Sequence, residues 1–245
     1  MNILSIDIGG TNVKLLATGQ TERRKFPSGL TMTPRRLVDK VKELTADWKY
    51  DVISIGYPGR VVADRPVTEP RNLGPGWVGF DFAAAFGVPV KVINDAEMQA
   101  LGAYRGGAML FLGLGTGLGS ALIVRGHIVS MELGALAYKK GIIEDIIGRR
   151  GLERLGKRKW QKAIDQLATR FVSALLLDDF VIGGGNAKKL KTLPAHCRLG
   201  NNADAFIGGY RLWESAASRQ ALAEQPPPEG NGAAAARRAA TGVRH

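Results

Sequence analysis

Two glycine-rich turns, at residues 9–11 and 115–117, constrain the fold of this chain more than any other feature. Each turn follows an apolar, strand-like segment, and each is followed by a second short strand-like segment rather than by a helix. A dinucleotide-binding fingerprint has to open a helix, so the Gly-x-Gly pattern of the second turn does not indicate that fold. Two strand–turn–strand segments far apart in the sequence instead predict an α/β protein with two similar lobes.

The composition of these turns favours an anion as their ligand. Glycine lets the backbone approach a phosphate closely and aim several N–H groups at it, and a neighbouring threonine adds a hydroxyl donor. Asp7 precedes the first turn, and a carboxylate there is suited to holding Mg²⁺ through water. Together these residues predict phosphoryl transfer, although either turn alone is also typical of a tight hairpin without a ligand.

Length and composition set outer limits on the protein class. The 245 residues, of which 45% are hydrophobic and 23% charged, can form one large or two modest domains. No apolar run approaches the roughly 20 residues that span a bilayer, and the chain enters a strand at once, so we expect no membrane segment, no signal peptide and a cytoplasmic protein. The single Cys197 excludes an intramolecular disulfide and a cysteine-cluster zinc site.

The net charge of +12 suggests an acidic partner. The strongest basic cluster holds Arg149, Arg150, Arg154, Lys157, Arg158, Lys159 and Lys162, with Glu153 as its one acid. This cluster is either a solvated helix face or a surface for a polyanion, such as nucleic acid or a long phosphate chain. The sequence carries no helix-turn-helix, zinc-finger or aromatic RNA-binding signature, so we expect no specific nucleic-acid partner.

The chain divides by composition into four parts. These are an N-terminal lobe over 1–105, a C-terminal lobe over 106–202, a closing helix over 203–219 and a disordered basic tail over 220–245. Within the second lobe, the pattern predicts helices over 142–155 and 158–176.

Asn94 and Asp95 follow a buried strand, at a position where side chains of an α/β sheet emerge into a ligand site. Transfer of a phosphoryl group to a hydroxyl needs a carboxylate that accepts the hydroxyl proton, and an adjacent amide can orient the acceptor. The alternative is structural, because Asp95 could instead cap the helix that begins at Ala96.

The motifs occur in an order that resembles one known family, the ROK sugar kinases, and within it the polyphosphate glucokinase branch. In sequence order they are Asp7-Ile8-Gly9-Gly10-Thr11, Gly56-Tyr57-Pro58-Gly59, Arg71-Asn72-Leu73-Gly74-Pro75-Gly76-Trp77, Asn94-Asp95, Gly115-Thr116-Gly117, Glu132-Leu133-Gly134 and Gly183-Gly184-Gly185. The resemblance extends over residues 1 to about 214. It implies a two-lobed actin-like fold with the active site in the cleft between the lobes.

The resemblance also implies an activity and a role for each motif residue. The activity is transfer of a phosphoryl group from ATP, polyphosphate or both to the 6-hydroxyl of glucose or a similar hexose. Asp95 would be the general base, Asp7 would position Mg²⁺, and Asn94, Glu132, Asn72 and Gly59 would bind the sugar. Gly9, Gly10, Thr11, Thr116 and Gly117 would bind donor phosphates, while Gly184, Gly185 and Asn186 would lie against the adenosine of ATP.

Two departures from the family pattern limit this carry-over. The family's cysteine-rich zinc loop is absent, so we expect no structural zinc. The Glu-x-Gly-His pattern reads Glu-Leu-Gly-Ala here, and Ala135 therefore leaves the choice of sugar open. A non-catalytic sugar- or nucleotide-binding regulator of the same fold is the alternative function, and a homodimer is compatible with the resemblance. A nucleic-acid-binding module would rest on charge alone.

Overall fold

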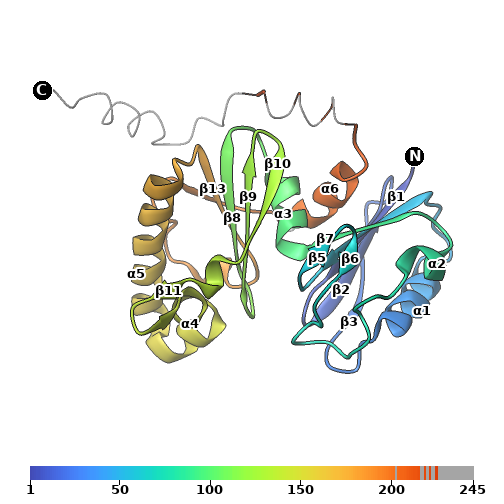
Figure 1. Cartoon of the computed structure of the whole chain (residues 1–245), viewed down its shortest axis with the longest axis horizontal. Coiled ribbons are helices and arrows are strands. Elements are labelled where there is room, and N and C mark those ends of the chain that lie inside the picture. Colours follow the sequence, from blue (N-terminus) through green and yellow to red (C-terminus); the bar gives the residue numbers. More distant parts are fainter. Residues whose placement is uncertain (202, 216–217, 219–220, 222–223, 226–245) are drawn as a thin grey trace, which may run out of the picture. The chain divides into compact units, whose positions relative to one another are not determined.

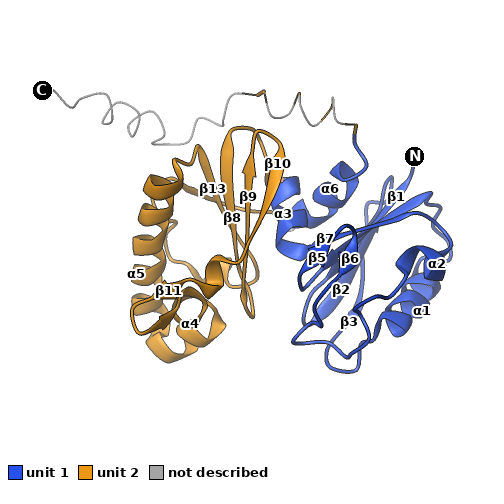
Figure 2. Cartoon of the chain, in the orientation of Figure 1, with its two compact units in different colours: residues 1–102, 202–214 blue, residues 103–201, 215–245 orange. Residues whose placement is uncertain are grey.

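The computed structural model describes residues 1–201, 203–215, 218, 221 and 224–225 (Figure 1). Most of the tail expected over 220–245, and the end of the closing helix expected over 203–219, lie outside these residues. The chain forms two compact units (Figure 2). Unit 1 comprises residues 1–102 with 202–214, and unit 2 contains residues 103–201.

Unit 1 is built on a five-stranded sheet in the order β3-β2-β1-β4-β7. Its strands are β1 (Ile3–Ile8), β2 (Asn12–Ala17), β3 (Arg24–Pro27), β4 (Val52–Tyr57) and β7 (Val90–Asn94). The first three pair antiparallel, whereas β1, β4 and β7 run parallel. The carboxyl ends of these parallel strands therefore meet at one edge of the sheet, where Asp7 pairs with Gly56 and Tyr57 pairs with Asn94.

Helices cover both faces of this sheet (Figure 1). They are α1 (Pro34–Leu44), α2 (Phe82–Phe86), α3 (Asp95–Ala103) and α6 (Asp204–Arg211), and a small hairpin joins β5 (Val61–Val62) to β6 (Arg65–Pro66). Alternate residues of a strand face opposite sides. Leu4, Ile6 and Ile8 therefore enter the core with α1 and α2, while Ser5 and Asp7 face the other side. The α1 helix begins at a Thr33 cap and buries its apolar stripe in the same core.

Small residues let α6 lie unusually close to its neighbours in unit 1. A Cβ added to Gly208 would lie 1.8 Å from the carbonyl oxygen of Met98 in α3, so only glycine fits there. The buried Ser54 hydroxyl donates to the Gly209 carbonyl at 2.6 Å and accepts from Trp213 Nε1 at 2.9 Å. These hydrogen bonds hold α6, the helix predicted to close the fold, and the residues after it against β4.

Unit 2 repeats the sheet arrangement of unit 1, with the order β10-β9-β8-β13-β14. Its strands are β8 (Ala108–Leu114), β9 (Leu118–Val124), β10 (His127–Met131), β13 (Asp179–Gly183) and β14 (Cys197–Leu199). Here too the first three are antiparallel and the last two extend β8 in parallel. The expected strand–turn–strand character of both glycine-rich turns is thereby confirmed, although β3, β10 and β14 had no clear signal in the sequence.

Helices and short elements complete unit 2. They are the 3-10 helices η1 (Leu133–Ala135) and η2 (Ala187–Lys189), the hairpin strands β11 (Ala137–Tyr138) and β12 (Gly141–Ile142), and the helices α4 (Ile143–Ile147) and α5 (Arg149–Leu175). The helix expected over 142–155 is divided, because α4 ends at Gly148. Gly156 (φ 72°) then interrupts α5, so the helix expected over 158–176 begins after a kink. Trp160 holds the second part of α5 by donating to the Ile147 carbonyl at 2.7 Å.

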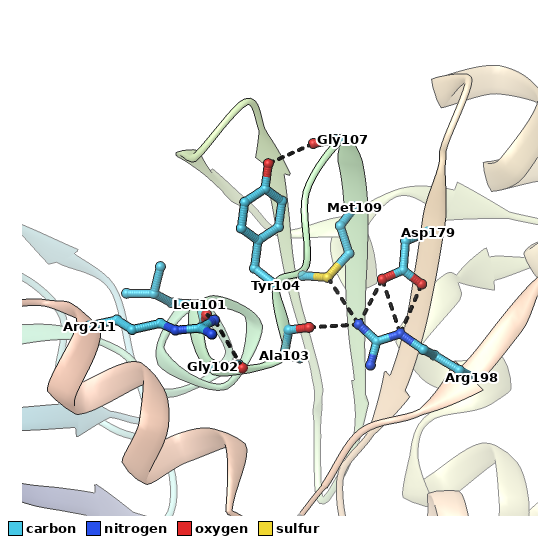
Figure 3. A network of polar contacts seen from close by, with 9 residues as sticks. All are labelled: Leu101, Gly102, Ala103, Tyr104, Gly107, Met109, Asp179, Arg198 and Arg211. Carbon is cyan, nitrogen blue, oxygen red and sulfur yellow. Dashed lines mark hydrogen bonds and ion pairs between the residues drawn. The ribbon is translucent and has the colours of Figure 1, made fainter. Parts of the chain in front are cut away.

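Arginines bind the carboxyl end of α3, where the chain passes from one unit to the other (Figure 3). In unit 2, Arg198 on β14 forms an ion pair at 2.7 Å with Asp179 and donates to the Ala103 carbonyl at 2.6 Å. In unit 1, Arg211 donates to the carbonyl of Leu101 at 2.7 Å. Cations at a helix carboxyl end satisfy its last carbonyl groups and complement the helix dipole.

Candidate functional site

Asp7 at the end of β1 is paired with a lysine rather than left as an isolated acid. Its side chain is 7% exposed, and one oxygen lies 2.9 Å from Lys14 Nζ, on the strand directly opposite. Asp7 and Lys14 are cross-strand partners, so the β1–β2 register itself creates the ion pair. Lys14 is thus held beside Asp7, the predicted Mg²⁺ ligand.

The first glycine-rich turn, Gly9 to Thr11, projects from the same sheet edge. The Ser28 hydroxyl donates to the Gly9 carbonyl at 2.6 Å, and the Ser28 N–H donates to the Thr11 carbonyl at 3.0 Å. Asn72 lies against this turn, because a Cβ added to Gly10 would be 3.5 Å from Asn72 Cβ. The structure therefore places a predicted sugar-binding amide beside a predicted phosphate-binding turn within unit 1.

At the end of β7, Asn94 is hydrogen-bonded to Gly59 and directly precedes Asp95, and both of these are predicted site residues. Its Nδ2 donates to the Gly59 carbonyl at 3.1 Å, and its Oδ1 accepts from the N–H groups of Ala96 at 2.9 Å and Glu97 at 3.3 Å. This pattern makes Asn94 the side chain that caps α3. Asp95 is the first residue of that helix, and its Oδ1 also accepts from Ala96 N at 2.9 Å. The helix-capping role that was the alternative for Asp95 is therefore performed mainly by Asn94.

The loop that carries Asn72 is held by the exposed acid Glu69 and by the buried ring of Trp77. Both oxygens of Glu69 accept from Trp77 N, at 3.1 and 3.2 Å, and Trp77 Nε1 donates to the Gly74 carbonyl at 2.6 Å. The Tyr57 ring packs on Trp77 with centroids 5.5 Å apart. Burial, and then the charge of Glu69, raise the pKa of Tyr57 well above its usual range. Sequence reasoning did not single out Glu69, because nothing local distinguishes it from a solvated loop acid.

The second glycine-rich turn, in unit 2, is packed against the predicted adenosine-binding segment. Asn186 N donates to the Leu114 carbonyl at 2.9 Å, and Asn186 Nδ2 donates to the Gly115 carbonyl at 3.0 Å. Gly184 (φ 81°) approaches so closely that an added Cβ would lie 2.6 Å from the Leu114 carbonyl oxygen. The structure thus brings residues 184–186 to the turn at 115–117.

Glu144 is a residue of this region that sequence reasoning missed. Its Oε2 accepts from Leu118 N at 3.2 Å and lies 3.2 Å from a Cβ added to Gly117 and 3.4 Å from one added to Gly134. The Glu144 side chain therefore lies against both the turn at 115–117 and η1, the 3-10 helix that follows the predicted sugar ligand Glu132. At the start of α4, Glu144 looks in the sequence like an ordinary first-turn helix acid, which hides this role.

Glu132 and Ala135 are exposed residues at the two ends of one backbone turn, in which Ala135 N donates to the Glu132 carbonyl at 3.0 Å. The Ser120 hydroxyl fixes the start of this turn, because it donates to the Met131 carbonyl at 2.9 Å and accepts from Leu133 N at 3.0 Å. Glu132 lies in unit 2, whereas Asn72, Gly59 and Asn94 lie in unit 1.

The described residues contain no group of three or more His, Cys, Asp or Glu side chains placed to share a metal ion. They also contain no helix that is both long and apolar enough to cross a bilayer.

Comparison with known proteins identifies relatives of the chain. The family model named ROK matches residues 3–137. The bifunctional enzyme NanE/NanK of Brucella melitensis is 33% identical over 141 residues, which are 52% of the chain but only 27% of that enzyme. The polyphosphate glucokinase of Mycobacterium tuberculosis (strain CDC 1551 / Oshkosh) is 27% identical over 214 residues, covering 75% of the chain and 77% of the relative.

A solved structure shows the same fold. The inorganic polyphosphate/ATP-glucomannokinase of Arthrobacter sp. strain KM superposes with a TM-score of 0.72 at 24% identity, covering 84% of the chain and 96% of that protein. The fold is therefore the two-lobed, actin-like ATPase fold of the ROK sugar kinases, as the order of the motifs implied. Because the family match covers more than half of the residues, the chain belongs to the ROK family.

Proposed function

We propose that this protein is a sugar kinase that transfers a phosphoryl group from ATP, polyphosphate or both to the 6-hydroxyl of glucose or a similar hexose. One observation carries the proposal. Asp7 and the Asn94–Asp95 pair lie at the carboxyl ends of parallel strands in one sheet, with β4 between them. Adjacent strands are about 4.8 Å apart, so the backbones that carry the two acids are separated by about 10 Å. That spacing leaves room for a phosphoryl group and an acceptor hydroxyl.

In this proposal Asp95 accepts the proton of the acceptor hydroxyl. Asn94 fixes the position of Asp95 by capping α3, because its Oδ1 holds the N–H groups of Ala96 and Glu97. A base on the first turn of a capped helix has little freedom to move, which favours a productive geometry. Asn72, Gly59 and Glu132 hold other hydroxyls of the sugar.

The residues at the β1 end fit Mg²⁺ in the way this ion is commonly bound. Mg²⁺ keeps several waters and uses one or two carboxylates together with substrate phosphates, and Asp7 supplies one buried carboxylate. When bound, the ion would neutralise charge on the donor phosphates. Lys14 already neutralises Asp7, so it would stand beside the donor phosphates as a second cation.

Donor binding is assigned to both turns. Backbone N–H groups and hydroxyls of Gly9, Gly10, Thr11, Thr116 and Gly117 hold phosphates, and Gly184, Gly185 and Asn186 lie against adenosine. Support for polyphosphate as a donor comes from the likeness to a polyphosphate glucokinase and from the basic cluster on α5. Within that cluster, Arg149 pairs with Glu153 at 2.9 Å, whereas Lys157, Arg158, Lys159 and Lys162 are exposed beyond the kink.

The proposal is tested by coupled assays of glucose phosphorylation with Mg²⁺ and either ATP or polyphosphate. General-base catalysis contributes roughly 10²- to 10⁴-fold, so Asp95→Asn is expected to lower kcat by that factor with either donor. Asp39→Asn, an exposed acid on α1, is the matched control and should retain activity. Turnover that survives in Asp95→Asn would contradict the assignment. Sugar binding without turnover by either donor would instead support the alternative, a non-catalytic regulator.

The two donors are separated by neutralising the exposed part of the basic cluster. Replacing Lys157, Arg158, Lys159 and Lys162 by Gln should depress the polyphosphate-dependent rate and spare the ATP-dependent rate, because only the longer anion reaches these cations. Equal losses with both donors would refute the role in polyphosphate binding.

Ala135→His is expected to lower the KM for glucose, by restoring one hydrogen bond of about 0.5–1.5 kcal/mol.

A further inference from the structure

A hollow of about 570 Å³ lies in unit 2, and its lining contains none of the residues assigned above. It is formed between the β11–β12 hairpin and α5, and we call it the Tyr138 pocket. Its lining consists of Ala137, Tyr138, Lys139, Gln166, Thr169 and Arg170. The lining contains two cations and no acid.

The two cations are held on one aromatic ring. Lys139 Nζ lies 5.2 Å and Arg170 Cζ lies 5.6 Å from the centroid of Tyr138, whose side chain is buried with 8% of the residue exposed. Lys139 adopts a positive φ of 55°, a backbone conformation uncommon for a residue with a side chain. Attraction of a cation to a ring is modest, so both side chains keep a positive charge that an anion can neutralise.

Among the neutral residues of the pocket, Gln166 supplies hydrogen-bond donors. It accepts from the Tyr138 hydroxyl at 3.5 Å through Oε1, which keeps its amide N–H groups for other partners, whereas the Thr169 hydroxyl donates to the Asp165 carbonyl at 3.1 Å. Asp165, the acid on α5 one residue before Gln166, accepts from the Gln161 amide at 2.9 Å.

The pocket continues a basic stripe along α5. Arg158, Lys162, Gln166, Thr169 and Arg170 are exposed and recur at helical spacing, so they share one face of the helix. At 1.5 Å per residue this stripe is about 18 Å long, which suits an extended anion better than a single phosphate. Single-stranded nucleic acid binds through exposed aromatic platforms, whereas the only ring here is buried and flanked by cations.

We propose that the Tyr138 pocket is a binding site for condensed phosphate, in which Lys139 and Arg170 hold phosphate groups of a chain remote from the one that is transferred. This inference rests on the proposed use of polyphosphate as a donor, and it extends that site beyond the basic cluster at 149–162. No bond is made or broken in the pocket. Its contribution is affinity and retention of the chain between transfers.

The experiment is calorimetric titration of the full-length chain with tripolyphosphate, without sugar. Lys139→Gln and Arg170→Gln are each expected to weaken binding about tenfold, since each removes a charge-assisted contact to phosphate. Lys40→Gln, a partly exposed lysine on α1 that pairs with Glu43, is the control and should bind like the parent. Equal affinities of all four proteins, or the same loss in Lys40→Gln, would overturn the proposal.

Two further arms keep the inference separate from the proposed function. In assays with polyphosphate, the pocket variants should raise the KM for polyphosphate and leave kcat and the ATP-dependent reaction unchanged. Pocket-dependent tripolyphosphate binding without any sugar phosphorylation would refute the function and retain the site. Polyphosphate-dependent turnover with an unchanged KM in both variants would retain the function and refute the site. Tight binding of a single-stranded oligonucleotide that tripolyphosphate does not displace would also refute it.

Discussion

The two glycine-rich turns stand on the same scaffold but are held by different kinds of side chain. Each connects two antiparallel strands of a five-stranded sheet whose remaining strands run parallel. In unit 1, the Ser28 hydroxyl donates to the carbonyl oxygen of Gly9 in the turn. In unit 2, the Asn186 amide donates to the Gly115 carbonyl, and in addition the Glu144 carboxylate accepts from the N–H group of Leu118 at the end of the turn.

This difference indicates a division of labour between the turns. A carbonyl oxygen of each turn accepts from a side chain, which leaves N–H groups for an anion, and the first turn also lies beside the Asp7–Lys14 pair. The second turn is buttressed by Asn186 and Glu144 from elsewhere in unit 2, so its shape depends on distant segments. We infer that the first turn supplies charge and the second supplies a fixed backbone surface.

The largest effect should come from replacing the glycine that supports the second turn. Gly184→Ala would place a Cβ 2.6 Å from backbone atoms of Leu114 at a φ of 81°, so neither the position nor the conformation accommodates it. We expect a loss of about 3 kcal/mol in the free energy of unfolding, measured by urea denaturation.

Gly10→Ala in the first turn is the matched control, because its Cβ would make only an ordinary contact at 3.5 Å with Asn72. The change in stability should stay within about 0.5 kcal/mol. Comparable losses in the two variants would show that the turns are equally constrained, contrary to the comparison.

Side-chain support of the turns should give the next largest effect. Glu144→Ala removes the acceptor of Leu118 N–H, which belongs to a buried residue, and should cost about 1–3 kcal/mol. Glu144→Gln retains an oxygen acceptor and should cost less than half as much. The counterpart Ser28→Ala frees a carbonyl on a partly exposed turn and should cost about 0.5–1 kcal/mol. A larger loss from Ser28→Ala than from Glu144→Ala, in urea denaturation, would reverse the comparison.

The sequence predicts the two glycine-rich turns, but it does not predict the side chains that support them. The strand–turn–strand pattern and the parallel strands ending at Tyr57 and Asn94 follow from local glycine and apolar periodicity, so they were predictable. Glu144 was not, because its contacts with residues 117 and 134 are formed by tertiary packing. Similarly, no local pattern distinguishes Asp95 as a cap from Asn94 as a cap, since both amide and carboxylate oxygens accept from N–H groups. The Tyr138 pocket requires α5 to be packed against a hairpin that had no clear signal.

The charge beside the first turn can be tested by a double-mutant cycle. Lys14→Met leaves the buried Asp7 carboxylate without its ammonium partner, and we expect a loss of about 1–2 kcal/mol, between the values for exposed and buried pairs. Asp7→Asn with Lys14→Met should recover part of that loss. The Mg²⁺ concentration for half-maximal activity should fall in Lys14→Met, because a repelling cation has been removed. No coupling between the two substitutions would contradict the ion pair.

The smallest effect should come from a charge pair of unit 1 that is remote from the turn. Arg24 on β3 donates to Asp47 at 2.6 Å and stacks 4.2 Å from the centroid of Trp48. The guanidinium lowers the pKa of Asp47 to about 2, below its value in the unfolded chain. The pair therefore contributes stability that is fully present above about pH 4 and is lost as the pH falls through 2. Asp47→Asn should lower the Tm slightly at pH 6, with a difference from the parent that shrinks below pH 4 and disappears below pH 2. In an Arg24→Met background the same substitution should give no such pH-dependent difference, because the interaction that lowers the pKa is already gone. A difference that persists there would assign the effect to Asp47 alone.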